Sequence, residues 1–439
     1  MKLSFSRAIA FLALFGIANV IAVPVEIDSK RHAEFLQRAE EILDRMPVID
    51  GHNDFPMNLR DLAFNDLRRV NFSSDLTQVE PWASHPYSFT DLPRLRKGKV
   101  GGQFWVAYTP CSSSNKDSVP QTVEQIDVIK RLAAAYPDDL HYATSAADIE
   151  YAIENKKIAS LVAIEGGHSI QSSAGILRQL YELGARYLTL THNCNTPWAD
   201  AAPVDASSNP IQPANNGLSD FGLELIEEMN RLGIMVDLSH VSIATMKAAL
   251  NKTRAPVIFS HSSAKAVCNH HRNVPDDVLQ QVKENGGLVM VNFYRGFVQC
   301  DSSKNATLAD LVAHVQHIKN LIGPDHVGIG ADFDGISEAV QGLEDVSKYP
   351  ELFAALLETG NWTEEELEKL SGRNLIRVFK AVESVRDALR EEQPMQTVIT
   401  KEEVDRANLT TACITADFID TRNSYRDNLV APPVEMKSI

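Results

Sequence analysis

Short apolar runs and longer amphipathic stretches alternate along most of the chain. The apolar runs contain few polar residues between their hydrophobic ones, a pattern typical of strands that are buried on both faces. Eight runs of this kind lie at 46–50, 100–108, 158–164, 186–191, 233–239, 256–261, 287–294 and 326–332. The pattern therefore predicts a series of strand–helix units.

The stretches between the runs have the spacing of amphipathic helices. Residues 174–184, 220–233 and 307–323 each place apolar side chains on one face and end at a glycine, the usual helix stop. Eight strand–helix units favour an α/β fold of the (β/α)8 TIM-barrel type. A doubly wound open sheet is the alternative, but no G-x-G-x-x-G motif follows an early strand.

The two ends of the chain differ from this repeating part. Residues 1–23 combine basic residues, an apolar run and small residues, which is the layout of a cleaved signal peptide rather than a membrane anchor. Residues 24–393 form the expected barrel domain, which includes an extra C-terminal helix. Residues 394–439 are more polar and are expected to be a tail. The last residues have no hydrophobic stretch, so we expect no lipid anchor.

Composition narrows the class of protein. The chain has 439 residues, of which 44% are hydrophobic, enough for a large core. Its formal net charge is -16 and it has no Lys/Arg-rich run, which disfavours nucleic acid and acidic membrane surfaces as partners. A signal peptide implies secretion, where N-x-[ST] sequons can be glycosylated. The sequons begin at Asn71, Asn251, Asn305, Asn361 and Asn408.

The cysteines are consistent with an oxidising compartment. They are Cys111, Cys194, Cys268, Cys300 and Cys413. Five cysteines allow two disulfides and one spare thiol, which could join two subunits. The alternative, five scattered buried thiols, would suit a cytosolic enzyme better.

Metal-ligand side chains follow six of the eight expected strands. In a barrel of this type the functional groups gather at the carboxyl ends of the strands. Any single histidine there is more often structural, but repeated placement of groups that are costly to bury unpaired predicts a site. These residues are His52, Asp54, Glu165, His192, His240, His261, Asp332 and Asp334.

The ligand set indicates which metal such a site would hold. Imidazole and carboxylate without thiolate suit Zn²⁺, with Mn²⁺ or Co²⁺ as alternatives. Three histidines and two carboxylates exceed the three protein ligands of an ordinary catalytic zinc. Two ions that share one carboxylate would use all five, and such a pair can hold a hydroxide that attacks a carbonyl. The pattern therefore predicts a metal-dependent hydrolase.

The motifs, taken in order, resemble the membrane (renal) dipeptidases, zinc metallopeptidases related to the amidohydrolase barrels. The resemblance covers nearly all of the mature chain. It rests on PVIDGHNDFP, IEGGHS, YLTLTHNCNTPWAD, DLSHVS, HRNVPDDVL, LVMVNFY, VGIGADFDG, GLEDVSKYPEL and NLIRVFKAVE. It implies a secreted dinuclear zinc dipeptidase that hydrolyses free L-dipeptides by attack of a metal-bridging hydroxide.

The resemblance assigns the metal ligands. His52 and Asp54 would bind one zinc ion, and His240 and His261 would bind the other. Glu165 would bridge the two ions in each subunit.

The resemblance also assigns the groups that bind and process the substrate. His192 would stabilise the oxyanion, and Arg272 would bind the carboxylate of a dipeptide, for which a planar guanidinium is suited. Asp332 would bind the free α-amino group and pass a proton to the leaving amine. It is preferred to Asp334 because it aligns with the family's strand-eight aspartate. An arginine and an aspartate at opposite ends fit a molecule with two free termini and one peptide bond.

The resemblance further implies covalent and subunit contacts. Cys111–Cys194 and Cys268–Cys300 would be intrachain disulfides. Cys413 would match a thiol that joins two subunits, although the tail around it matches poorly. A homodimer is expected, while the missing lipid-anchor signal favours a soluble secreted enzyme.

Two other functions compete with the dipeptidase. A different barrel hydrolase, such as a phosphotriesterase or deaminase relative, usually begins with H-x-H and often bridges its metals with a modified lysine. The H-x-D start and Glu165 argue against it. A catalytically silent binding protein is the third possibility, but all five ligand positions are filled.

Overall fold

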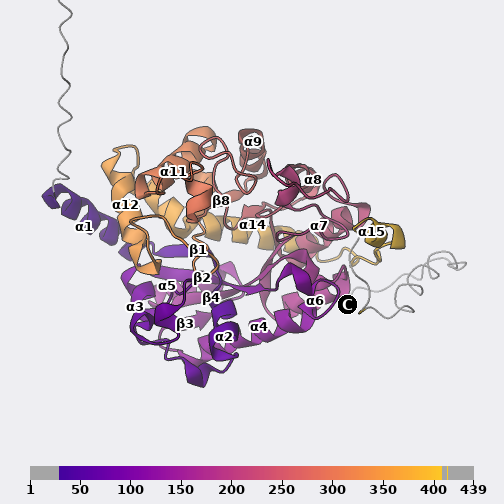
Figure 1. The fold of residues 1–439 in the computed structure, drawn as a ribbon, viewed down its shortest axis with the longest axis horizontal. Coiled ribbons are helices and arrows are strands. Elements are labelled where there is room, and N and C mark those ends of the chain that lie inside the picture. The colour runs from indigo at the N-terminus through magenta and orange to yellow at the C-terminus, as the bar shows by residue number, and fades with distance from the viewer. Residues whose placement is uncertain (1–28, 408–412, 414–439) are drawn as a thin grey trace, which may run out of the picture.

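A closed barrel of parallel strands lies at the centre of the computed structural model, which describes residues 29–407 and Cys413. The strands of the barrel are β1 (Val48–Asn53), β2 (Val100–Tyr108), β4 (Ile158–Glu165), β5 (Ala185–Thr189), β6 (Met235–Asp237), β7 (Ile258–Phe259), β8 (Leu288–Val291) and β9 (Val327–Ile329). They follow the order β2-β1-β9-β8-β7-β6-β5-β4, and β2 pairs with β4 to close the circle. Helices surround the strands (Figure 1). The predicted (β/α)8 barrel is confirmed.

One additional strand lies outside the barrel circle. β3 (Leu140–Tyr142) pairs in parallel with the first residues of β4, and β5 takes over this edge of β4 from Val162 onward. β3 has three residues and only its first is fully buried. It therefore lacks the continuous apolar run from which the other strands were predicted.

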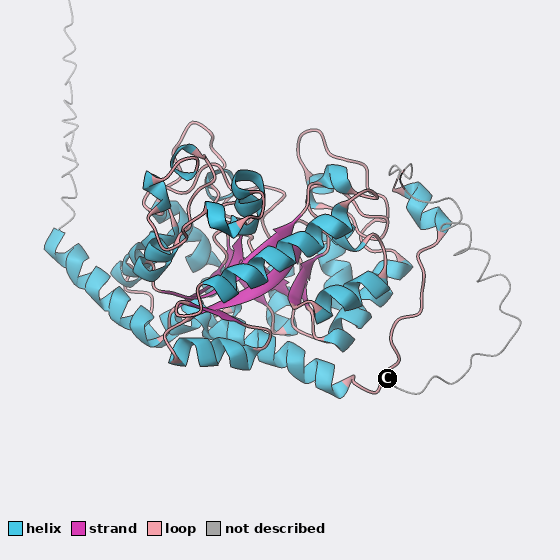
Figure 2. Ribbon diagram, turned by 90° about the horizontal axis from the view of Figure 1, so that it is seen from below, coloured by secondary structure: helices cyan, strands magenta, loops and turns pink. Residues whose placement is uncertain are grey.

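The helices lie outside the barrel wall, so the strands are enclosed when the molecule is viewed from below (Figure 2). The stretches predicted to be helical are α6, α7 and α11, and serine or threonine side chains cap the start of each. The helices are α1 (Ser29–Arg45), α2 (Phe55–Ala63), α3 (Leu92–Lys97), α4 (Ser118–Ala135), α5 (Ala146–Glu154), α6 (Ala174–Glu182), α7 (Asp220–Leu232), α8 (Ile243–Lys252), α9 (Asp276–Asn285), α10 (Arg295–Val298), α11 (Leu308–Ile322), α12 (Tyr349–Glu358), α13 (Glu364–Glu368), α14 (Asn374–Ala388) and α15 (Lys401–Arg406).

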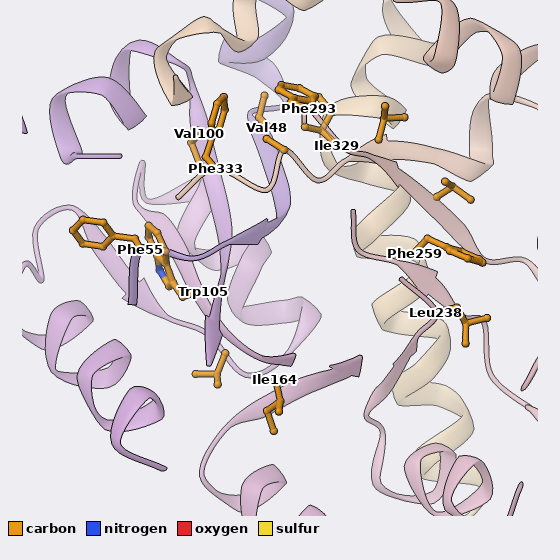
Figure 3. Packing of buried hydrophobic residues seen from close by; sticks show 14 of the residues in the cluster. Val48, Phe55, Val100, Trp105, Ile164, Leu238, Phe259, Phe293, Ile329 and Phe333 are labelled. Carbon is orange, nitrogen blue, oxygen red and sulfur yellow. The ribbon is translucent and has the colours of Figure 1, made fainter. Parts of the chain in front are cut away.

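Alternation along each strand sends side chains into two apolar layers. Phe104 of β2 and Tyr187 of β5 have ring centres 5.0 Å apart although their strands are not neighbours, so both side chains lie inside the barrel. Trp105, the next residue along β2, instead lies 6.1 Å from the ring of Phe55 on α2. Figure 3 shows residues of the outer layer, which packs between the strands and the surrounding helices. Burial on both faces explains why the runs carry so few polar residues.

The described part of the C-terminal segment, residues 394–407, lies against α7 (Figure 1). The backbone N–H of Met395 donates to Glu228 Oε2 at 3.1 Å, and the N–H of Phe221 donates to Glu403 Oε1 at 3.3 Å. Glu228 is 2% exposed, so its contacts are made in a largely water-free setting. Glu228 therefore helps to hold residues 394–407 against α7.

Replacing Glu228 with glutamine should lower the free energy of unfolding at pH 7 by about 2 kcal/mol, because its arginine partners would lose a buried anion. Burial alone would raise the pKa of Glu228, but hydrogen bonds from Arg231, Met395 and Arg178 lower it below its ordinary value of 4.5. A lowered native pKa stabilises the fold above the unfolded pKa, and the benefit is lost as the pH falls through the native pKa.

The difference between wild type and Glu228→Gln should therefore shrink toward zero in acid. Denaturant unfolding at neutral pH and at about pH 3 measures it. Glu227→Gln is the matched control, because Glu227 pairs with Lys252 and its side chain is 49% exposed. An equal difference at both pH values would contradict this account.

The structure places several of the remaining expected features. It joins Cys111 to Cys194 and Cys268 to Cys300, and it leaves Cys413 exposed and unpaired. The side chains of four sequon asparagines are exposed, at positions 71, 251, 305 and 361. Asn408 and residues 1–23 lie outside the described residues. No helix between residues 29 and 407 is long and apolar enough to cross a bilayer.

Candidate metal centre

Four predicted ligands from different strands meet at the carboxyl edge of the barrel. Glu165 is the last residue of β4, and imidazoles reach it from β1 and from the ends of β6 and β7. The Nε2 atoms of His240 and His261 lie 3.2 and 3.4 Å from Glu165 Oε1. His52 Nε2 lies 3.7 Å from Glu165 Oε2. One carboxylate therefore stands between three imidazoles.

Two aspartates complete the cluster on the side of His52. His52 Nε2 lies 3.3 Å from Asp54 Oδ2 and 3.8 Å from Asp332 Oδ1. Ligand atoms of three sets of residues each lie within 4.8 Å of one another. The sets are His52, Asp54 and Glu165; His52, His261 and Asp332; and Glu165, His192 and His240.

Hydrogen bonds at Nδ1 orient the three imidazoles of the cluster. His52 Nδ1 lies 3.0 Å from the Tyr187 hydroxyl oxygen, which itself donates to the Gly51 carbonyl at 2.9 Å. His240 Nδ1 lies 3.1 Å from Asn193 Oδ1. His261 Nδ1 lies 2.7 Å from the hydroxyl of the preceding serine. Each ring can thus donate from Nδ1 and keep the Nε2 lone pair free, the arrangement that metal-binding histidines use.

The Nε2 atoms of His52 and His261 are buried and have no hydrogen-bond partner among the described residues. Burial lowers the pKa of His240 and His261 far below the ordinary value, so both rings are neutral. Burial also opposes charge on His52, yet the neighbouring Glu165 and Asp54 carboxylates raise its pKa to about 10. Burial raises the pKa of Glu165 to about 8. Two neutral imidazoles beside a group of buried carboxylates, whose charged forms a cation would stabilise, fit a site for divalent cations.

Three aspartate or histidine residues at the site have left-handed backbones. The φ angles are 65° for His240, 68° for Asp332 and 67° for Asp334. Residues with a Cβ adopt this region rarely, and such conformations concentrate at functional sites. His240 lies three residues after the end of β6 and Asp332 three residues after the end of β9, and all three side chains line the cavity.

A cavity of about 500 Å³ opens over the cluster. It is lined by Asp54, Met57, Asn58, Asp61, His85, Tyr87, Tyr108, Glu165, His192, Asn193, His240, Tyr294, Phe297, Asp332, Asp334, Gly335, Ile336 and Ser337. The His192 ring centre lies 4.4 Å from that of His240 and 4.9 Å from that of Tyr108. Burial lowers the pKa of His192 to about 3, so this ring faces the cavity as a neutral group.

Arg272 is placed beside the cavity rather than in its lining. It is 2% exposed, and its guanidinium lies 5.3 Å from the ring centre of Phe297, a lining residue. Nη1 donates to Ser262 Oγ and Nη2 donates to the His261 carbonyl, both at 3.3 Å, while Nε has no partner between residues 29 and 407. Arg272 thus has an unused N–H donor close to His261.

The two aspartates after β9 have different surroundings. Asp332 Oδ2 accepts a hydrogen bond from Asn292 Nδ2 at 2.8 Å, which leaves Oδ1 toward His52. Asp334 accepts from Asn58 Nδ2 at 2.7 Å and from the Thr90 hydroxyl. Asp334 therefore links the segment after β9 to α2 and to the segment before α3, while Asp332 faces His52.

Several residues that shape the site were not predicted. Tyr187, Asn193 and Ser260 orient the imidazoles, and Asn292 orients Asp332. His85 enters the cavity lining from a loop that no motif had marked. A polar residue inside an otherwise apolar run, such as the Asn292 position, was the available signal.

A parallel eight-stranded barrel with buried histidines and carboxylates at its carboxyl edge is an architecture typical of metal-dependent hydrolases. Residues 36–393 match the profile of the membrane dipeptidase family, peptidase family M19. The chain belongs to this family. It is therefore a metallopeptidase of the dipeptidase class, and the resemblance inferred from the motifs is confirmed.

Relatives and solved structures agree with this family. Over 363 residues the chain is 45% identical to Dipeptidase 3 of Rattus norvegicus, an alignment that covers 82% of this chain and 70% of that protein. Over 365 residues it is 43% identical to Dipeptidase aclJ of Aspergillus oryzae, covering 81% and 83%. A metallo peptidase from Rhodobacter sphaeroides, liganded with a phosphinate mimic of the dipeptide L-Ala-D-Ala, superposes with a TM-score of 0.66 at 25% identity. That superposition covers 77% of this chain and 99% of the other.

Proposed function

We propose that the protein is a secreted dinuclear zinc dipeptidase that hydrolyses dipeptides with two free termini. The observation that carries the proposal is the position of Glu165, whose Oε2 faces His52 of β1 while Oε1 faces the imidazoles of His240 and His261. A single ion would not need a carboxylate that both halves of the cluster share.

The ligand residues divide into two sets around this carboxylate. His52 and Asp54 would hold one ion together with Glu165 Oε2. His240 and His261 would hold the other with Oε1, the oxygen they lie nearest. When bound, two divalent ions would acidify a shared water and polarise the scissile carbonyl.

The other cavity residues would bind and orient the dipeptide. Neutral His192 would donate a hydrogen bond to the oxygen that gains charge when the carbonyl is attacked. Arg272 would bind the substrate carboxylate through its unused Nε donor. Asp332 would accept a hydrogen bond from the α-amino group and deliver a proton to the leaving nitrogen.

The proposal includes the protein's setting. Residues 1–23 would be removed as a signal peptide, and the exposed sequon asparagines would carry glycans. The two disulfides support this setting, because such bonds persist in oxidising compartments. We further propose a homodimer, in which Cys413 could join the two subunits.

Removal of metal should abolish hydrolysis of free dipeptides, and added zinc should restore it. The assay compares free, N-acetylated and C-amidated forms of alanyl-alanine before and after treatment with a chelator. L- and D-alanine at the second position are both included, because a structural neighbour binds a mimic of L-Ala-D-Ala. Metal analysis of the active protein should give two zinc ions per chain.

Each result of this assay decides between functions. Zinc-dependent cleavage restricted to free dipeptides supports the proposal in full. Cleavage of the blocked substrates would keep the hydrolase and remove the roles given to Arg272 and Asp332. Bound metal without any cleavage would favour a silent binding protein, and cleavage of esters or amidines alone would favour another barrel hydrolase.

A further inference from the structure

We propose that Asp237 is a positioning residue that sets the tautomer of His261 through Ser260. This inference rests on the proposed function insofar as His261 binds metal, but the hydrogen-bond chain that carries it lies within the protein alone. It gives a role to three buried polar side chains that do not face the cavity.

These side chains form one polar layer inside the barrel. Thr189, Asp237 and Ser260 come from the adjacent ends of β5, β6 and β7, and each is fully buried. The period of two along a strand places them one layer above Tyr187, Met235 and Ile258, which are apolar or aromatic. A carboxylate in this layer is costly unless its oxygens are hydrogen-bonded.

Four donors satisfy the two oxygens of Asp237, with two backbone N–H groups at one oxygen and two hydroxyl groups at the other. Oδ1 accepts the backbone N–H groups of Ser239 and Ser260, at 3.1 and 2.8 Å. Oδ2 accepts the hydroxyl groups of Thr189 and Ser260, both at 2.6 Å. One position therefore requires an acceptor, because it faces only backbone N–H groups, whereas the other faces hydroxyl groups, which can either donate or accept.

The direction of the chain follows from these contacts. Because the Ser260 hydroxyl gives its proton to Asp237, its oxygen accepts from His261 Nδ1, 2.7 Å away. Ser239 Oγ is a poorer alternative acceptor at 3.4 Å. His261 then carries its proton on Nδ1, and the lone pair of Nε2 points toward Glu165.

An asparagine at position 237 should reverse this chain. The two backbone N–H groups would hold the amide oxygen at the Oδ1 position, so the amide nitrogen would take the place of Oδ2. That nitrogen would donate to Ser260, whose hydroxyl proton would turn toward His261 Nδ1. The imidazole would then carry its proton on Nε2, the tautomer that cannot bind metal through that atom.

Histidine-labelled full-length protein tests the tautomer directly by two-bond nitrogen–proton NMR spectra without added metal. His261 should be Nδ1-protonated in wild type and Nε2-protonated in Asp237→Asn. With zinc present, chelator competition should show that the site formed by His240 and His261 binds zinc roughly 10- to 100-fold more weakly in Asp237→Asn than in wild type. The loss should be smaller in Ser260→Ala, and adding Asp237→Asn to Ser260→Ala should cause no further loss.

Asp50→Asn is the matched control. Asp50 Oδ1 also accepts two backbone N–H groups, from His52 at 2.9 Å and Ala331 at 3.1 Å, but Oδ2 accepts the Tyr349 hydroxyl and leads to no imidazole. This variant should leave the His261 tautomer unchanged. An unchanged tautomer in Asp237→Asn, or an equal zinc loss with and without Ser260, would overturn the inference. A wild type that shows the Nδ1 tautomer but binds no zinc would instead overturn the proposed function.

Discussion

Replacing His261 with alanine should lower kcat/KM for a free dipeptide by about 10⁴-fold or more. The imidazole lies 3.4 Å from the carboxylate of Glu165, and its buried Nε2 has no hydrogen-bond partner in the part of the chain that the structure describes. The proposed ligands act together in holding the metal ions, so removing one of them should cost nearly as much activity as removing all of them. Metal analysis should show one fewer zinc ion per chain in the same sample.

A second histidine provides the control for this variant. His326 directly precedes β9, at the opposite end of the barrel, and its Nδ1 contacts the Gly287 carbonyl at 2.9 Å. His326→Ala should keep both the zinc content and the activity. A fully active His261→Ala protein would show that this residue is not a metal ligand.

Replacing Arg272 with methionine should lower kcat/KM for free dipeptides by about 10²- to 10³-fold, with most of the change in KM. Methionine keeps much of the buried volume but cannot pair with a carboxylate. C-amidated dipeptides lack that carboxylate, so the variant should handle free and amidated substrates almost equally. Steady-state kinetics on the two substrates measures the change in preference.

The same substitution at a distant arginine separates charge loss from destabilisation. Arg178 Nη1 donates to Glu228 Oε1 at 2.9 Å, and Arg178 has no hydrogen bond or ion pair to the proposed metal ligands. Arg178→Met should lower stability without altering the preference for a free carboxylate. If Arg272→Met retained the wild-type preference, another group would have to bind the substrate's C-terminus.

The barrel could be predicted because its strands are buried on both faces. Eight continuous apolar runs correspond to eight strands, even at β7, which has only two residues within the run 256–261. β3 escaped prediction because it has three residues and a half-buried edge position. Sequence reports burial well, but it reports the length of a strand poorly, since pairing with neighbours decides where a strand ends.

The residues proposed as metal ligands stand out in the sequence because histidine and carboxylate at strand ends are unusual, and the structure brings them together. The groups that orient them could not be predicted, because serine, asparagine and tyrosine are common in loops and cores. Ser260 is an ordinary residue in the sequence and becomes informative only when its hydroxyl is seen between Asp237 and His261. The substrate role of Arg272 came from resemblance to the family, and its position beside the cavity was not evident from the sequence.

The left-handed backbones of His240, Asp332 and Asp334 bear on how such a site survives over generations. Glycine adopts this conformation without strain, whereas a residue with a Cβ pays roughly 1–2 kcal/mol. At each of these positions, mutation to glycine would ease the backbone while deleting the functional side chain. Glycine at these positions is therefore compatible with the barrel, and a gene copy released from selection for activity would tolerate it there.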